Sequence, residues 1–162
     1  MTAHLHFYRR DWRTRSWLFA LLVPLLCIAQ NQPGLRIEQA WARATPPGVG
    51  VGGAYLTIVN DGPADELVAL SSPVSQSTEM HRTTMKGSMM EMRQVEKLPV
   101  AAHSRIRFQP GELHVMLVNL KQPLQEGQHF MLELRFAHAG RKTVEVVVRA
   151  LGDPGPAETS SH

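Results

Sequence analysis

The sequence predicts an all-β fold, an antiparallel β-sandwich or barrel of about eight or nine strands. Short runs of strand-forming residues recur along the chain, turn signals separate them at regular spacing, and no helical period follows the first 29 residues. With 162 residues, 43% of them hydrophobic, the chain can bury one substantial core. A single folded domain is therefore expected.

Each predicted strand is bounded by Gly, Pro, Asn, Asp or Ser residues, which favour turns. The run at 129–136, HFMLELRF, alternates most regularly, so its four apolar residues from Phe130 to Phe136 should share one buried face. The branched run TVEVVV at 143–148 is typical of a buried or central strand. In chain order the expected strands are 35–41, 54–60, 66–70, 78–85, 89–95, 105–108, 115–120, 129–136 and 143–148.

The first 29 residues have the pattern of a secretory signal peptide. Four arginines precede a run of thirteen apolar residues, Trp17 to Ala29, which is shorter than a membrane-spanning helix needs and contains Pro24. Small residues before Gln30 predict cleavage after Ala29. A lipoprotein anchored through Cys27 is the alternative, although Leu26 is bulky for that processing.

Removal of residues 1–29 changes the charge and cysteine content of the protein. The segment holds four of the 17 basic and one of the 14 acidic residues, so the mature chain keeps 13 of each. No excess of positive charge then favours nucleic acid. Cys27 is the only cysteine, so the mature protein has no disulfide, thiolate ligand or cysteine nucleophile. The mature domain is expected over 30–151, followed by a solvated, flexible tail at 152–162.

A methionine-rich hairpin is expected in the middle of the chain. Between strands 78–85 and 89–95, Gly87-Ser88 suits a two-residue turn with a positive φ at the glycine. That register pairs Met85 with Met90, Thr83 with Met92 and His81 with Gln94, and all six side chains share one face. Met80 and Met89 point to the other face and should serve packing, as should Met131.

Four residues form a candidate metal site. His81 and Met92 are diagonal neighbours on the predicted hairpin, and His114 and Met116 point the same way on a later extended segment. Thioether sulfur is soft and uncharged, so two imidazoles with two thioethers favour Cu(I) over zinc, calcium or magnesium. The missing cysteine argues against a blue-copper centre, which needs a thiolate. Met85 and Met90 are expected to form an apolar shelter around the ion.

The spacing of these four residues resembles the HX10MX21HXM signature of the PCu(A)C periplasmic copper chaperones. Further similar segments are AWARATPPG, GGAYLTIVN, GELHVMLVNLKQPLQEGQ and the closing TVEVVV, so the resemblance covers about Ile37 to Arg149. It implies a cupredoxin-like Greek-key β-sandwich that binds one Cu(I) through His81, Met92, His114 and Met116. It also implies a periplasmic location and copper delivery to the CuA centre of cytochrome c oxidase, alongside Sco-type proteins. A monomer is expected.

Other residues are expected to have ordinary roles. His103, His129, His138 and His162 have no metal-ligand spacing, and the tail lacks the His- and Met-rich extension with which some relatives take Cu(II). Trp41 and Tyr55 are expected to be core aromatics. No Ser-His-Asp pattern, paired-carboxylate motif or phosphate-binding loop stands out, so no enzymatic activity is expected.

Two other hypotheses remain open at this point. The same ligands would serve a copper buffer or resistance protein that has no dedicated acceptor. A metal-free interaction module would use the methionines only as an adhesive surface, and it predicts no Cu(I) binding.

Overall fold

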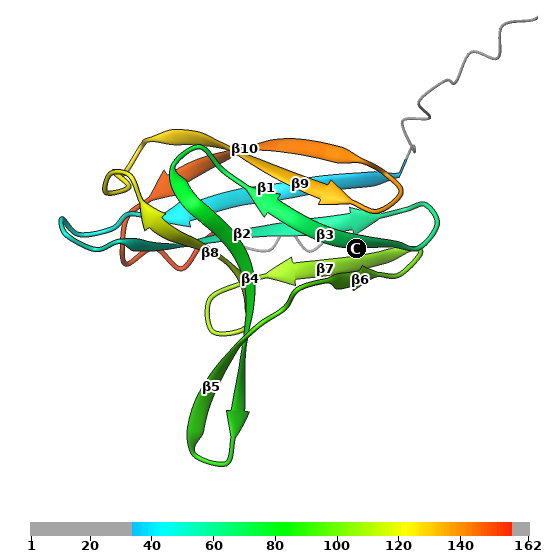
Figure 1. Cartoon of the computed structure of the whole chain (residues 1–162), viewed down its shortest axis with the longest axis horizontal. Coiled ribbons are helices and arrows are strands. Elements are labelled where there is room, and N and C mark those ends of the chain that lie inside the picture. Colours follow the sequence, from blue (N-terminus) through cyan, green and yellow to red (C-terminus); the bar gives the residue numbers. More distant parts are fainter. Residues whose placement is uncertain (1–33, 157–162) are drawn as a thin grey trace, which may run out of the picture. The chain divides into compact units, whose positions relative to one another are not determined.

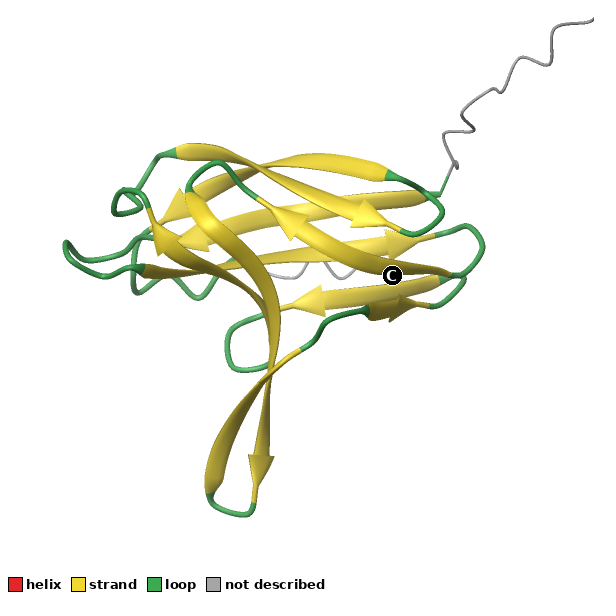
Figure 2. Cartoon of the chain, viewed as in Figure 1, coloured by secondary structure: helices red, strands yellow, loops and turns green. Residues whose placement is uncertain are grey.

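The structure, a computed structural model, describes residues 34–156, and these residues form an all-β domain without helices (Figures 1 and 2). The described part of the chain thus contains no helix long and apolar enough to cross a membrane. The predicted signal segment at 1–29, with Cys27, lies outside the described residues, as do residues 157–162. The strands are β1 (Leu35–Arg43), β2 (Val51–Asn60), β3 (Asp65–Ser71), β4 (Ser75–Lys86), β5 (Met89–Gln94), β6 (Leu98–Val100), β7 (Ser104–Phe108), β8 (Leu113–Leu120), β9 (His129–Phe136) and β10 (Arg141–Arg149).

The strands form one continuous hydrogen-bonded sheet in the order β5-β4-β8-β2-β1-β10-β9-β3-β6, with β7 joined to β2. Strand β2 pairs along one edge with β8 at Val51–Ala54 and then with β7 at Leu56–Asn60. All pairs are antiparallel except that between β1 and β10, which is parallel. The predicted all-β class is confirmed.

One hydrophobic core lies inside the domain. It receives alternate side chains from the paired strands, since successive side chains of a strand point to opposite faces. In β9 the predicted alternation is confirmed: Phe130, Leu132, Leu134 and Phe136 are buried. Strands β2, β8 and β10 contribute a large part of the same core, with Ala54, Leu56, Ile58, Leu113, Val115, Leu117, Val146 and Val148.

Trp41 and Tyr55 are buried but belong to the face of β1 and β2 opposite the main core. They are paired across the two strands with ring centroids 4.5 Å apart, and the Arg43 guanidinium lies 5.9 Å from the Trp41 ring. Gly155 packs so closely against Trp41 that a Cβ there would lie 2.5 Å from the indole. The beginning of the predicted flexible tail is therefore packed against the domain.

The β4–β5 hairpin extends beyond the rest of the sheet (Figure 1). Pairing of β4 with β8 runs from Ser75 to Arg82, where it meets Leu113 near the start of β8. Beyond Arg82, β4 pairs only with β5, as far as Lys86 opposite Met89. The outer part of the hairpin therefore has no third strand beside it.

Nine of the ten strands correspond to those predicted. The additional one is β6, Leu98–Val100, which is only three residues long and contains Pro99, a residue that disfavours strands. The other difference is the parallel pairing of β1 with β10, where antiparallel pairing alone was expected. Strand β2 also begins at Val51 rather than residue 54, because Gly52 and Gly53 take part in pairing with β8.

Candidate metal centre

The predicted register of the β4–β5 hairpin is confirmed. His81 pairs with Gln94, Thr83 with Met92, and Met85 with Met90. Gly87 adopts a φ of 66°, as the predicted turn requires. Met80 is buried in the core on the opposite face. These pairings place Met92 diagonally from His81 on the same face.

Strand β8 brings the second half of the predicted set next to His81. His81 is directly opposite His114 in the β4–β8 ladder, and the centroids of the two rings are 6.1 Å apart. Met116 lies two residues further along β8, opposite Glu79, and so shares the face of His114. The intervening Val115 points into the core. The structure thus collects His81, His114 and Met116 on one face of adjoining strands.

His81 sits where the two ladders meet, since it pairs with both His114 on β8 and Gln94 on β5. The neighbouring strands cover it, so only 15% of its side chain is exposed. Met92 lies one step further out on the hairpin, and 51% of it is exposed. The site is therefore covered at its histidine end and open to solvent at Met92.

The hydrogen bonds of His81 leave one ring nitrogen available. Nε2 lies 2.9 Å from Glu79 Oε2, and a carboxylate can only accept, so Nε2 carries the proton. In the neutral ring Nδ1 then holds a lone pair, and this atom is buried without a hydrogen-bond partner. A buried polar atom without a partner is uncommon, and a bound ion would supply one.

His114 offers its opposite nitrogen. Its Nδ1 lies 2.9 Å from the backbone carbonyl of Glu112, so Nδ1 donates and Nε2 keeps the lone pair. The same carbonyl accepts a hydrogen bond from the backbone N–H of Thr83, 3.1 Å away. The carbonyl of Glu112 therefore orients the His114 ring and also binds Thr83 at the base of the hairpin.

Glu79 is a functional candidate that the sequence analysis did not identify. It receives hydrogen bonds from His81 and from the Ser77 hydroxyl, and the His81 hydrogen bond is the main reason that the pKa of its carboxyl is lowered. Its position two residues before His81 on a strand, hence on the same face, was the available signal. It acts as an orienting partner of His81, a common arrangement for metal-binding histidines.

On the side of β8 away from β4, Met116 is paired with a glycine of β2. Gly53 of β2 is opposite Met116, and a Cβ built on Gly53 would lie 2.9 Å from the Tyr55 hydroxyl oxygen. The absent side chain therefore makes room for the end of Tyr55 next to Met116. Burial raises the pKa of Tyr55, while the charge of Arg43 acts in the opposite direction.

Met85 and Met90 do not form the predicted shelter. They lie on the expected face, but 64% of Met85 and 70% of Met90 is exposed. Met85 and Met90 lie beyond Leu113, where β8 begins, and this position explains their exposure. Side chains so open to solvent cannot keep water from an ion at His81.

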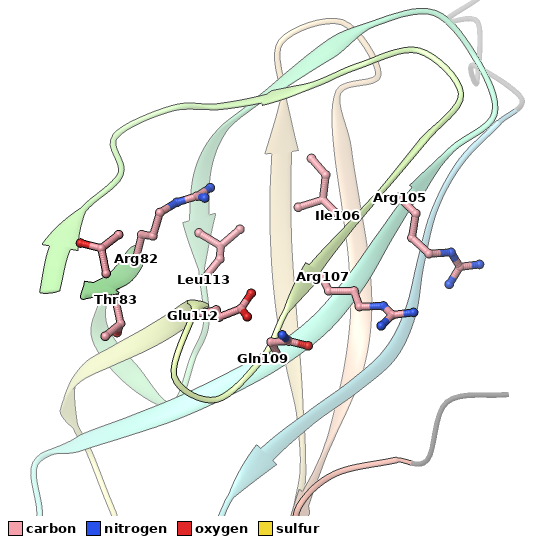
Figure 3. A pocket seen from close by; sticks show the side chains of 9 residues that line it. Arg82, Thr83, Arg105, Ile106, Arg107, Gln109, Glu112 and Leu113 are labelled. Atoms are coloured by element: carbon pink, nitrogen blue, oxygen red, sulfur yellow. The ribbon is translucent and has the colours of Figure 1, made fainter. Parts of the chain in front are cut away.

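A groove of about 610 Å³ beside the base of the hairpin is separate from this site. Figure 3 shows Arg82, Arg105 and Arg107 around it, with Glu112 from the loop before β8. None of the four predicted ligands lines it. Three guanidinium groups and the Glu112 carboxylate line it, and Arg105 is paired with Glu38 at 3.1 Å, so the groove offers none of the soft ligands that Cu(I) prefers.

The described residues contain no group of three or more His, Cys, Asp or Glu side chains that could hold a metal ion. The two facing imidazoles are accompanied by thioethers, which are soft, neutral ligands. Two available imidazole nitrogens of fixed orientation fit a soft monovalent ion, and Nδ1 of His81 has no other partner. The donor set therefore fits Cu(I).

Comparison with known proteins gives a consistent family assignment. The model of the family described as "Putative lipoprotein LpqE-like" matches residues 35–148. "Putative lipoprotein Lxx21020" from Leifsonia xyli subsp. xyli is 30% identical over 118 residues, which cover 72% of this chain and 70% of that protein.

Solved structures give the same fold. DR1885 from Deinococcus radiodurans, in its CuI form, is 30% identical with a TM-score of 0.60, and the match covers 75% of this chain and 81% of that one. The copper-bound PCuAC domain from PmoF2 is 25% identical with a TM-score of 0.63, covering 74% of this chain and 95% of the domain. The predicted cupredoxin-like fold is confirmed by these similarities.

Proposed function

Because the chain belongs to the LpqE-like family, the family of the PCuAC domains, we propose that it is an exported carrier of copper. It binds one Cu(I) through Nδ1 of His81, Nε2 of His114 and the thioether sulfurs of Met92 and Met116. The observation that carries this proposal is the buried, unpartnered Nδ1 of His81 in a ring that faces His114. The copper-bound forms of DR1885 and of the PmoF2 domain support the choice of metal.

The four ligands suit transport rather than catalysis. All are neutral, so the bound ion keeps its positive charge and remains attractive to an acceptor with anionic thiolates. Binding and release require only ligand exchange, since both imidazole lone pairs are free before the ion arrives. Met92, half exposed on the hairpin, is the ligand that an acceptor reaches first.

The proposed acceptor is the CuA centre of cytochrome c oxidase, reached directly or through Sco-type proteins, as the resemblance implies. An acceptor with anionic thiolates would draw Cu(I) away from neutral thioethers, since a thiolate is a soft ligand that also carries negative charge. The carrier acts as a monomer in the periplasm after cleavage behind Ala29. Anchoring through Cys27 is the alternative, and the lipoprotein descriptions of the family and of the Leifsonia relative support export in either form.

Titration of the purified protein with Cu(I) against a competing chelator, without oxygen, tests the site. One equivalent is expected to bind tightly, and His114→Ala and Met92→Ala should each weaken binding at least about tenfold. Met131→Ala is the matched control, because Met131 is a similarly exposed methionine on β9, away from the site. A stoichiometry far from one, or unchanged affinity in both ligand variants, contradicts the proposal.

Deletion of the gene tests the delivery role. Loss of oxidase activity at low copper, restored by adding copper, supports delivery to CuA. Sensitivity only at high copper would show instead that the protein is a copper buffer.

A further inference from the structure

The outer part of the β4–β5 hairpin carries three exposed methionines on one face. Met85, Met90 and Met92 are 64%, 70% and 51% exposed. Large apolar side chains at this exposure bury little surface and add little to folding stability. These three methionines are therefore candidates for binding a ligand from solution.

The strand register places the three side chains next to one another on one face of the hairpin. Met85 is directly opposite Met90, and Met92 is two residues from Met90 and diagonal to Met85. Opposed residues have Cβ atoms roughly 5 Å apart and diagonal ones roughly 7 Å apart, and the long, flexible methionine side chains can bridge such distances. Met89 is equally exposed, but it pairs with Lys86 on the other face of the hairpin.

On the same face of the hairpin, the three methionines adjoin the four-ligand site. Met92 is diagonal to Met85 on its outer side and diagonal to His81 on its inner side. The hairpin beyond Arg82 has no third strand beside it (Figure 1). The three methionines on this part of the hairpin are exposed to solvent. A soft ion that arrives at the tip thus meets thioethers before it meets imidazoles.

We propose that Met85, Met90 and Met92 form a second Cu(I) site, made only of thioethers, that captures the ion and passes it to His81 and His114. Its passing role rests on the proposed function of the four-ligand site, whereas its capture of the ion does not. Three neutral thioethers bind Cu(I) selectively but more weakly than a set that includes two imidazoles. The free-energy difference directs the ion inward.

The transfer is an exchange of ligands with no change of oxidation state. The bonds from copper to Met85 and Met90 break while bonds form to Nδ1 of His81, Nε2 of His114 and the sulfur of Met116, and Met92 stays bound. No proton is released, because each of these nitrogens already holds a lone pair. Since the two sites share Met92, the protein still holds one tightly bound ion.

Cu(I) titration in the variant His81→Ala/His114→Ala tests the outer site by itself. This variant should keep one weakly bound Cu(I), and adding Met85→Leu/Met90→Leu should weaken that binding at least about tenfold. Adding Met89→Leu instead should change it less than about twofold. Leucine keeps the size and apolar character of methionine and removes only the sulfur. Equal binding in the Met85→Leu/Met90→Leu and Met89→Leu proteins would overturn the proposal.

Stopped-flow loading of the protein with its histidines intact provides a second measurement, independent of whether the His variant folds. Met85→Leu/Met90→Leu should slow Cu(I) uptake from a chelator about tenfold relative to Met89→Leu, and equal rates would overturn the passing role. A different result is expected if the proposed four-ligand site does not exist. The unsubstituted protein would then bind Cu(I) no more tightly than the variant His81→Ala/His114→Ala.

Discussion

His81 and His114 are directly opposite each other on β4 and β8, with ring centroids 6.1 Å apart, and they leave different ring nitrogens without a hydrogen bond, Nδ1 of His81 and Nε2 of His114. Glu79 holds the proton of His81 at Nε2, and the carbonyl of Glu112 holds that of His114 at Nδ1. The nitrogen that keeps the lone pair is therefore fixed in each ring by a different part of the chain, Glu79 of β4 for His81 and Glu112 before β8 for His114. A metal site with this arrangement is prepared for its ion before binding.

The protonation pattern leads to a direct spectroscopic prediction. In ¹⁵N NMR spectra of the metal-free protein at neutral pH, Nδ1 of His81 and Nε2 of His114 should be the unprotonated nitrogens. Cu(I) should shift these two signals and affect Nε2 of His81 and Nδ1 of His114 much less. His138, on the β9–β10 turn, is the internal control and should not shift. Shifts at the opposite nitrogens would contradict the assignment.

Glu79 should affect copper binding through the orientation of His81. Replacing Glu79 with Ala frees the imidazole to turn and to change tautomer, so Cu(I) affinity should fall about tenfold or more. Glu79→Gln keeps an oxygen that can accept from Nε2, so it should retain most of the affinity. Equal losses in both variants would show that the carboxylate charge matters and that orientation does not.

Gly53 should be needed to keep Tyr55 in place beside Met116. In Gly53→Ala the new methyl group would lie 2.9 Å from the Tyr55 hydroxyl, so the ring or β2 must shift. We expect a loss of about 1–3 kcal/mol in the free energy of unfolding, measured by urea denaturation. Gly50→Ala is the matched control, because no atom lies within 4 Å of its added methyl group. Similar stability of the two variants would contradict this packing account.

Asp65 should make the fold sensitive to acid. Partial burial raises the pKa of its carboxyl, but hydrogen bonds from the backbone N–H groups of Glu66, Ala139 and His138 lower it more, so its net pKa is below the usual value. The stabilisation is then present above the pKa that the Asp65 carboxyl has in the unfolded chain, about 3.9. It is lost as the pH falls through the lower pKa that this carboxyl has in the folded protein.

Replacing Asp65 with Asn should therefore cost on the order of 1 kcal/mol at pH 7, and the cost should shrink as the pH falls below about 4. Urea unfolding at several pH values measures this. Glu126→Gln, at an exposed turn, removes the same charge and serves as the control. A stability difference between Asp65→Asn and the unsubstituted protein that does not vary with pH would rule out this contribution.

Local sequence features were sufficient to predict the hairpin. Gly87-Ser88 set the turn, and the period of two then determined which residues share a face, including Met92 and His81. Alternation in 129–136 likewise identified the buried face of β9. In both cases the information lies within one strand or one turn.

Features that depend on long-range pairing could not be read from the sequence. The direct opposition of His81 and His114 depends on β4 lying beside β8, which are separated by three strands in the chain. The exposure of Met85 and Met90 depends on where β8 begins, because that point decides how much of the hairpin stands alone. The parallel β1–β10 pair joins the two ends of the domain and has no local signal.

X-ray absorption spectroscopy of the protein loaded with one equivalent of Cu(I) can identify the ligands of the ion, because nitrogen and sulfur neighbours scatter differently. If His81, His114, Met92 and Met116 hold the ion, copper should have two nitrogen and two sulfur neighbours. One sulfur should be lost in Met116→Leu and one nitrogen in His114→Ala. A copper environment of nitrogen and oxygen alone, unchanged by Met116→Leu, would contradict this set of ligands.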